Sequence, residues 1–221
     1  MIKGFIFDFD GLILDTELPI YATWRQIYQE FNQDLPLDIW VKCVGSSYDA
    51  FDPARHLQEL VNLDLDCDKL HARAVVMANE IINSTGPLPG VLDFLRTSRD
   101  NSIKMAVASS SDEQWVHGHL KRMNMYHFFD GICTLESVQQ VKPAPDLFLC
   151  ALKQLNLAAD EAVVFEDSVN GILAARSAGI QVVAIPNDIT RHLDFSQAGW
   201  IVPSFSGLTP TQVINHFDGN I

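Results

Sequence analysis

The chain has 221 residues, about one and a half times a typical domain, so we expect one domain with a large insertion or two small domains. Hydrophobic residues make up 48% and charged residues 19%, a globular composition that excludes an intrinsically disordered chain. The formal net charge of −13 argues against a protein that holds nucleic acid or an anionic membrane through a broad positive surface, so an anionic ligand must be held by local charge.

The first predicted element is a strand at residues 3–9, a short apolar run rich in aromatic and β-branched residues. Asp8 and Asp10 distinguish this segment from the uncharged centre of a secretory signal, and the chain lacks the roughly 18 to 20 consecutive apolar residues of a membrane span. We therefore expect a cytoplasmic protein, a monomer, with no membrane or nucleic-acid partner. The cysteines form no CxxC pair, which argues against a thiol redox motif or a zinc cage and favours reduced thiols at Cys43, Cys67, Cys133 and Cys150.

Residues 16–85 have helical periodicity and no convincing strand. Two sets of apolar residues recur at the spacing of one helix face and predict buried stripes: Tyr21, Trp24, Tyr28 and Phe31, and then Leu70, Ala74, Met77 and Ile81. The Pro- and Gly-rich stretch at residues 85–90 is typical of a domain boundary. The sequence thus predicts a core domain of residues 1–15 and 86–221, with a helical cap domain of residues 16–85 inserted after the first strand.

After this insertion, predicted strands and helices alternate along the chain. Strands are expected at residues 104–108, 162–165 and 181–185, and helices at residues 91–99, 112–123, 146–155 and 169–178. Such alternation predicts an α/β fold, a doubly wound parallel sheet with a Rossmann-like arrangement.

Acidic residues follow two of the predicted strands. Asp8 and Asp10 end the first strand, and Glu166 and Asp167 end the strand at residues 162–165. The carboxyl ends of the strands are where open α/β sheets bind ligands, and converging carboxylates repel one another unless a cation or a proton intervenes. Mg²⁺ suits such an oxygen-rich site. Locally, Asp-x-Asp-Gly also fits a plain turn, and Glu166-Asp167 also fits a helix cap.

Two further segments offer groups that bind anions. Ser109 and Ser110 follow the strand at residues 104–108 and precede a helix, whose free backbone N–H groups could hold a phosphate oxygen. A helix cap is an equally good interpretation of these serines. Lys142 precedes Pro143, which restricts the lysine backbone to extended conformations and indicates a loop of fixed conformation. In so acidic a chain, Lys142 is the best-placed fixed cation for a phosphate.

Taken in order, these residues resemble the four motifs of the haloacid dehalogenase superfamily of phosphotransferases. The matching segments are Asp8-x-Asp10-Gly11 with Asp15-Thr16, then Ser109, then Lys142-Pro143-x-Pro145-Asp146, and finally Glu166-Asp167-Ser168 with Gly171. The match spans essentially the whole chain. It is closest to the branch with a helical cap after the first motif, which holds β-phosphoglucomutase and many small sugar-phosphate phosphatases.

The resemblance implies a Mg²⁺-dependent phosphatase that hydrolyses small phosphate monoesters such as sugar phosphates. Asp8 would attack phosphorus and form an aspartyl-phosphate, and Asp10 would serve first as acid and then as base. Lys142 and Ser109 would hold the phosphoryl oxygens, with Ser110 beside them.

The resemblance also implies a metal site and a moving cap. Mg²⁺ would be bound by the side chain of Asp8, the backbone carbonyl of Asp10 and the side chain of Asp167, with Glu166 adjoining this shell. The cap would close over the sheet edge, hinged at Asp15 and Thr16 and at residues 86–90, and would select the leaving group. In the cap turn at residues 43–49, we expect substrate contacts from Gly45, Ser46 and Ser47.

Other functions fit parts of this pattern. β-Phosphoglucomutases typically carry a His four residues after Thr16 and an Arg shortly after the Gly of the cap turn, whereas this chain has Ile20 and Ser46-Ser47-Tyr48, a departure that favours a phosphatase. A non-catalytic phospho-ligand-binding or regulatory module, such as a receiver domain, also uses acids, Lys and Mg²⁺. Receivers are shorter, however, and do not carry the phosphorylated Asp on the first strand. A dehalogenase is disfavoured because that branch lacks the acid found here at Asp10.

Overall fold

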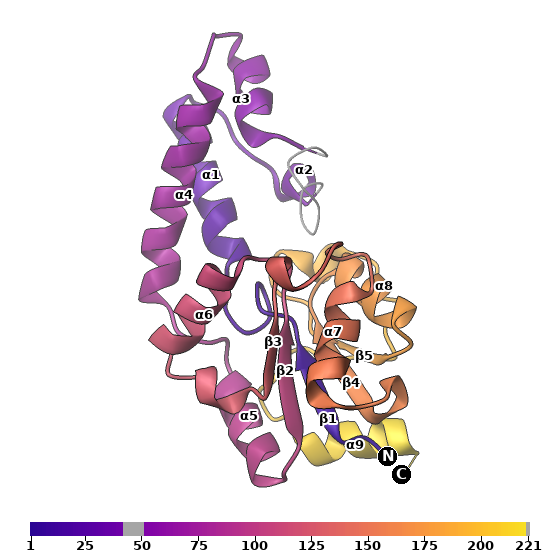
Figure 1. Cartoon of the computed structure of the whole chain (residues 1–221). Helices are drawn as coiled ribbons and strands as arrows, with labels where there is room; N and C mark the ends of the chain where they lie inside the picture. Colours follow the sequence, from indigo (N-terminus) through magenta and orange to yellow (C-terminus); the bar gives the residue numbers. More distant parts are fainter. Residues whose placement is uncertain (42–50, 220–221) are drawn as a thin grey trace.

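The structure, a computed structural model, describes residues 1–41 and 51–219, and its core is a parallel β-sheet flanked by helices (Figure 1). Within these residues, six strands pair in the order β3-β2-β1-β4-β5-β6, all of them parallel. The strands are β1 (Gly4–Phe7), β2 (Lys104–Ala108), β3 (Gly131–Cys133), β4 (Ala162–Glu166), β5 (Gln181–Ala184) and β6 (Trp200–Ile201). The predicted doubly wound parallel sheet is confirmed.

The strand order positions the site, because β1 lies at the centre and the chain winds outward from it in both directions. Phe7, the last residue of β1, is in register with Val107 of β2 and Phe165 of β4. The residues that follow these strands therefore emerge side by side at one edge of the sheet. In a doubly wound sheet, this change of winding direction at the carboxyl edge is where ligands bind.

Alternate residues of the strands supply the cores on the two faces of the sheet. Phe5 and Phe7 pack with α5 (Val91–Asp100), α6 (Glu113–Arg122) and α9 (Pro210–Asp218). Ile6 belongs to the opposite face, which is covered by two other helices, α7 (Asp146–Leu155) and α8 (Val169–Ser177). Because both faces are covered, the central strands are apolar without interruption, as the sequence pattern indicates.

The inserted segment forms four helices in the described residues: α1 (Glu17–Glu30), α2 (Leu37–Trp40), α3 (Pro53–Val61) and α4 (Cys67–Ser84). They lie together beyond one edge of the sheet, with α1 packed along α4 (Figure 1). Trp24 and Tyr28 of α1 are fully buried among these helices, as their spacing predicts.

The buried stripe of α4 differs from the predicted one. Ala74, Ala78 and Ile82 are its buried residues, whereas Ile81 is 42% exposed. Apolar residues occur on several faces of this helix, Val75 and Val76 being exposed as well, so helical spacing alone did not identify the packed face.

The two crossings between the sheet and the helical insertion lie side by side. Leu14 and Pro87 form an isolated antiparallel bridge, and the backbone N–H of Leu88 donates to the carbonyl of Ile13 at 2.8 Å. The predicted domain boundaries, and a hinge at these crossings, stay predictions.

The structure corrects the expectation of reduced thiols for one pair of cysteines. Cys133 of β3 and Cys150 of α7 form a disulfide, with their Cα atoms 6.3 Å apart, while Cys67 is free and Cys43 lies outside the described residues. The two partners are separated by 17 residues in sequence and meet only because α7 packs against β3. Within the described ranges, no helix is both long and apolar enough to cross a membrane.

Candidate active site

Three carboxylates meet at the carboxyl edge of the sheet. Asp8 follows β1, Glu166 ends β4 and Asp167 comes directly after it, and all three side chains are buried. One oxygen of each lies within 4.8 Å of an oxygen of the other two. Buried carboxylates this close repel one another, so the site needs positive charge or bound protons.

Lys142 supplies part of that positive charge. Its Nζ donates to Asp8 Oδ1 at 2.6 Å and to Glu166 Oε1 at 2.5 Å, and its side chain is only 6% exposed. Nζ also lies 5.1 Å from the centre of the Phe148 ring. Burial opposes the charged form, but the Asp8 and Glu166 carboxylates outweigh it and raise the pKa of Lys142 above its usual value. The lysine is therefore a fixed cation.

Asp167 has one oxygen in use and one free. Its Oδ2 accepts a hydrogen bond from Asn187 Nδ2 at 2.7 Å, whereas its buried Oδ1 has no hydrogen-bond partner. Burial and the charges of Asp8 and Glu166 raise the pKa of Asp167 well above its usual value. A buried carboxylate oxygen without a partner is costly unless a cation or proton occupies it. The donors Asp167 Oδ1 and Asp8 thus fit a hard divalent cation such as Mg²⁺, which prefers oxygen ligands.

Both oxygens of Glu166 are already in use. Oε1 accepts from Lys142, and Oε2 accepts from the backbone N–H and the hydroxyl of Ser168, at 3.1 and 2.9 Å. Ser168 is itself the N-cap of α8, accepting from the Gly171 N–H, so helix capping does not explain Glu166-Asp167. The geometry favours Glu166 as the group that holds Lys142, and its place beside a metal ion stays a prediction.

The backbone of α8 approaches Glu166 so closely that only glycine fits at position 171. A Cβ added there would lie 1.9 Å from Cδ of Glu166. We expect Gly171→Ala to lower the free energy of unfolding by about 3 kcal/mol and to displace Glu166. Gly118→Ala is the matched control, because this helical glycine of α6 faces open space and alanine should stabilise the protein by about 0.5 to 1 kcal/mol. Urea denaturation measures both changes, and equal effects would contradict the steric argument.

The carboxylate of Asp10 contacts α6 and the loop that precedes this helix. Its Oδ2 accepts from Ser111 Oγ at 2.6 Å and, at a longer 3.4 Å, from Ser109 Oγ, while Oδ1 accepts from Trp115 Nε1 at 2.9 Å. Burial, with a smaller contribution from the Asp8 charge, raises the pKa of Asp10, although the hydrogen bonds from Ser111 and Trp115 lower it in part. Such a carboxyl can carry a proton closer to neutral pH. Its predicted metal contact, through the backbone carbonyl, stays a prediction.

The predicted anion-binding serines occupy different environments. Ser109 is buried at the end of β2, and its Oγ accepts from the Ser111 N–H at 3.0 Å, whereas Ser110 is exposed. Asp112 caps α6 by accepting from the Trp115 N–H, so the capping alternative for Ser109 is wrong. Phosphate binding by Ser109 and Ser110 stays a prediction, and the cap residues Gly45, Ser46 and Ser47 lie outside the described residues.

Glu17 is a further acidic residue of this region that the motif analysis missed. It begins α1, and burial, followed by the charges of Asp10, Asp15 and Asp8, raises its pKa to about 7. The only available signal was its position two residues after Asp15 in the crossing to the insertion.

We expect the free energy of unfolding in EDTA to fall as the pH rises from about 5 to about 8. Burial, aided by the Asp8 charge, raises the pKa of Glu166 from 4.5 to about 7. Between these values the folded protein binds more protons than the unfolded chain, so this stabilisation is present below pH 4.5 and is lost as the pH passes 7. One such carboxyl accounts for about 3 kcal/mol. Urea denaturation across this range tests the sign. Glu166→Gln should make the fall shallower without abolishing it, because the raised pKa values of Glu17 and Asp167 act in the same direction. Stability that rises with pH would contradict the assignment.

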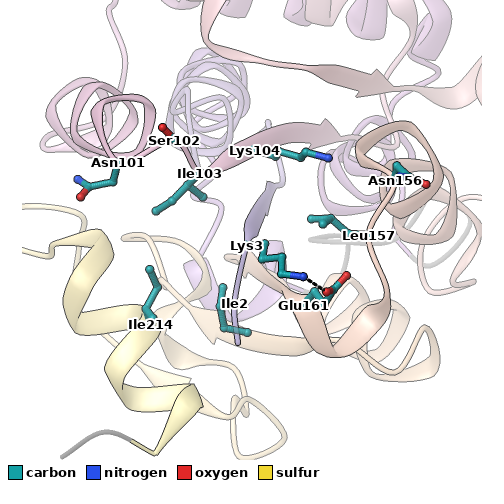
Figure 2. Close-up of a pocket in the computed structure, with 10 residues that line it drawn as sticks. All are labelled: Ile2, Lys3, Asn101, Ser102, Ile103, Lys104, Asn156, Leu157, Glu161 and Ile214. Atoms are coloured by element: carbon teal, nitrogen blue, oxygen red, sulfur yellow. Dashed lines mark hydrogen bonds and ion pairs between the residues drawn. The ribbon is translucent and has the colours of Figure 1, made fainter.

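A pocket of about 460 Å³ lies at the opposite edge of the sheet (Figure 2). It is lined by residues at the amino ends of β1, β2 and β4, including Lys3, Lys104 and Glu161. Lys3 is paired with Glu161, and Lys104 donates to the Leu155 carbonyl at 2.6 Å. The chemistry-bearing residues gather at the other edge, so this pocket is not the candidate site.

Comparison with known proteins agrees with this geometry. Residues 5–185 match the family described as haloacid dehalogenase-like hydrolase. The chain is 37% identical over 218 residues to YhcW of Bacillus subtilis (strain 168), provisionally named a phosphatase, with 99% of each chain covered. It is 31% identical over 183 residues to the fructose-1-phosphate phosphatase YqaB of Escherichia coli (strain K12), covering 82% of this chain and 95% of that protein.

The fold is likewise similar to solved structures. The crystal structure of a haloacid dehalogenase family hydrolase from Deinococcus radiodurans R1, with bound phosphate and sodium, aligns with a TM-score of 0.79. The alignment covers 97% of this chain and 96% of that one at 21% sequence identity, so it bears on the fold alone.

Proposed function

The chain belongs to the haloacid dehalogenase-like hydrolase family, and from this premise we propose that it is a Mg²⁺-dependent phosphatase that hydrolyses small phosphate monoesters through an aspartyl-phosphate. The observation that supports this most directly is the position of Lys142 Nζ, 2.6 Å from Asp8 at the edge where Asp167 keeps a free oxygen. This arrangement supports the proposal because the residues proposed as nucleophile, phosphate-binding cation and metal ligand lie at one edge of the sheet.

Asp8 is the nucleophile of the proposed reaction. Its carboxylate oxygen attacks phosphorus in line, forming an O–P bond as the bond from phosphorus to the leaving alkoxide breaks. Water then attacks the same phosphorus, and the bond to Asp8 breaks to release inorganic phosphate and restore the carboxylate. Splitting hydrolysis into two displacements lets one carboxylate serve both halves of the reaction.

Asp10 moves the protons of both steps. In its protonated form it donates to the leaving oxygen, and in its ionised form it accepts a proton from the attacking water. Its burial favours the protonated form, and its bonds to Ser111 and Trp115 favour the ionised form, so the residue can exchange between them.

Two positive charges relieve the repulsion between the anionic nucleophile and the anionic phosphate. Lys142 holds a phosphoryl oxygen beside Asp8, and Glu166 keeps the lysine in position by accepting a hydrogen bond from its Nζ. Asp8 and Asp167, with the Asp10 carbonyl, would hold a magnesium ion, which when bound would neutralise charge on the transferring phosphoryl group. Ser109 completes the phosphoryl pocket.

We further propose sugar phosphates and related phosphorylated metabolites as the substrate class. This rests on the E. coli relative, whose name states a fructose-1-phosphate phosphatase, and on the helical insertion beyond the catalytic edge. The insertion would close over the substrate, exclude water and select the leaving group, with the two adjacent crossings as its hinge.

A panel of hexose phosphates, nucleoside monophosphates and p-nitrophenyl phosphate, assayed with Mg²⁺ and with EDTA, tests the proposal. We expect phosphate release from sugar monophosphates that EDTA abolishes and excess Mg²⁺ restores. Hydrolysis that persists in EDTA would overturn the metal dependence, and the absence of any hydrolysis would favour a binding module. Conversion of β-glucose 1-phosphate to glucose 6-phosphate would instead identify a mutase.

A further inference from the structure

We propose that Asn187 is a positioning residue for the metal site, which orients Asp167 so that one of its oxygens stays free for a divalent cation. The inference rests on the proposed function and adds to it a residue that lies outside the four motifs. Asn187 follows β5, at the same carboxyl edge of the sheet as Asp8 and Asp167. No substrate atom is required to contact it.

The hydrogen bonds of Asn187 fix which way its amide faces. Its Oδ1 accepts from the backbone N–H groups of Ile189 and Thr190 at 2.9 and 3.0 Å. The reversed amide would direct N–H groups at those two donors, so the NH₂ group must face Asp167. There Nδ2 donates to Asp167 Oδ2 at 2.7 Å and to the Gly11 carbonyl at 3.2 Å.

This arrangement assigns different roles to the two oxygens of Asp167. Oδ2 is engaged by Asn187, which prevents the carboxylate from rotating, whereas the buried Oδ1 has no hydrogen-bond partner. Gly11 closes the other side, since a Cβ at this residue would lie 2.4 Å from Oδ2 and 2.8 Å from Asn187 Nδ2. Groups that orient a metal ligand in this way commonly contribute 10- to 100-fold to metal affinity.

The loop that carries Asn187 is itself firmly anchored. The Asn187 N–H donates to Thr190 Oγ1 at 3.0 Å, and Thr190 is fully buried. Ile189 is 2% exposed and belongs to the hydrophobic cluster of the helical insertion, alongside Trp24 and Ile27. The amide is therefore held from both sides, which is what precise orientation of a carboxylate requires.

Isothermal titration calorimetry with MgCl₂ alone, on the full chain without substrate, tests the inference. Asn187→Ser is the informative variant, because its hydroxyl can still accept from the loop N–H groups while the NH₂ donor is lost. Asp188→Ala is the matched control, because Asp188 is adjacent to Asn187 and its side chain is 69% exposed. The Mg²⁺ affinity of this variant should stay within about twofold of wild type. Thermal unfolding in EDTA identifies any loss of folding.

We expect the Mg²⁺ dissociation constant of Asn187→Ser to rise about 10- to 100-fold, with thermal unfolding in EDTA close to wild type. Wild-type affinity in this variant would overturn the inference and leave the phosphatase proposal standing. If the wild-type protein itself bound no Mg²⁺, the proposed metal site would fail and the inference with it. If Asn187→Ser is unfolded in EDTA at the temperature of the titration, Asn187→Ala is titrated instead, below its own unfolding temperature. Wild-type Mg²⁺ affinity in Asn187→Ala would also overturn the positioning role of Asn187.

Discussion

Asp8→Asn is expected to lower the hydrolysis of p-nitrophenyl phosphate by at least about 10⁴-fold, because removing a covalent nucleophile takes away the reaction path and not merely one contact. The amide has nearly the shape of the carboxylate but cannot form a stable bond to phosphorus. Lys142 keeps Glu166 as a partner in this variant, and one negative charge leaves a crowded cluster, so the fold should persist. Steady-state assays in excess Mg²⁺ measure the loss.

Asp10→Asn provides the matched control, because it makes the same replacement of a carboxylate by an amide two residues away from Asp8. This variant loses the general base of the second step but keeps the nucleophile, so with p-nitrophenyl phosphate, whose leaving group needs little protonation, it should accumulate the phosphorylated enzyme. Mass spectrometry after acid quenching would detect one added phosphoryl group on Asp10→Asn and none on Asp8→Asn. A phosphoryl group on the Asp8→Asn protein would show that another residue is the nucleophile.

The sequence was sufficient to predict the architecture because buried parallel strands have a strong signature. β1, β2, β4 and β5 are continuous apolar runs separated by helices, and each was predicted. β3 and β6 have only 3 and 2 residues, too few to show periodicity. α9 was missed although Thr209 and Gln212 form a capping box at its start, a signal that is present in the sequence.

The three clustered acids share one property: they end or directly follow strands of a parallel sheet, so topology alone brings Asp8, Glu166 and Asp167 to one edge. Trp115 contacts Asp10 from a helix, and Asn187 contacts Asp167 from a loop. Both contacts depend on local packing that has no sequence period. The Cys133–Cys150 disulfide was unpredictable for the same reason, since it depends on how α7 packs on β3.

Replacing Lys142 by methionine is expected to remove activity and to destabilise the fold at the same time. Activity should fall by at least about 10³-fold, as when other transition-state cations are removed from phosphoryl-transfer sites. In EDTA, the carboxylates of Asp8 and Glu166 would be left buried without their common partner, and breaking such a pair costs about 3 to 5 kcal/mol. Urea denaturation at pH 8 measures the loss in the free energy of unfolding. At this pH Glu166, with a pKa of about 7, is largely ionised in the wild-type protein.

The double variant Lys142→Met with Glu166→Gln separates these two effects. The glutamine removes the buried charge that the missing lysine leaves behind, while its amide can still contact Ser168. The double variant should therefore recover most of the lost stability and none of the activity, because the cation beside Asp8 is still absent. If activity returned together with stability, Lys142 would be a structural residue and the phosphate would have to be held by other groups. If neither returned, the cost would come from the contacts that Glu166→Gln does not address, namely those of the lysine ammonium with Asp8 and with the Phe148 ring.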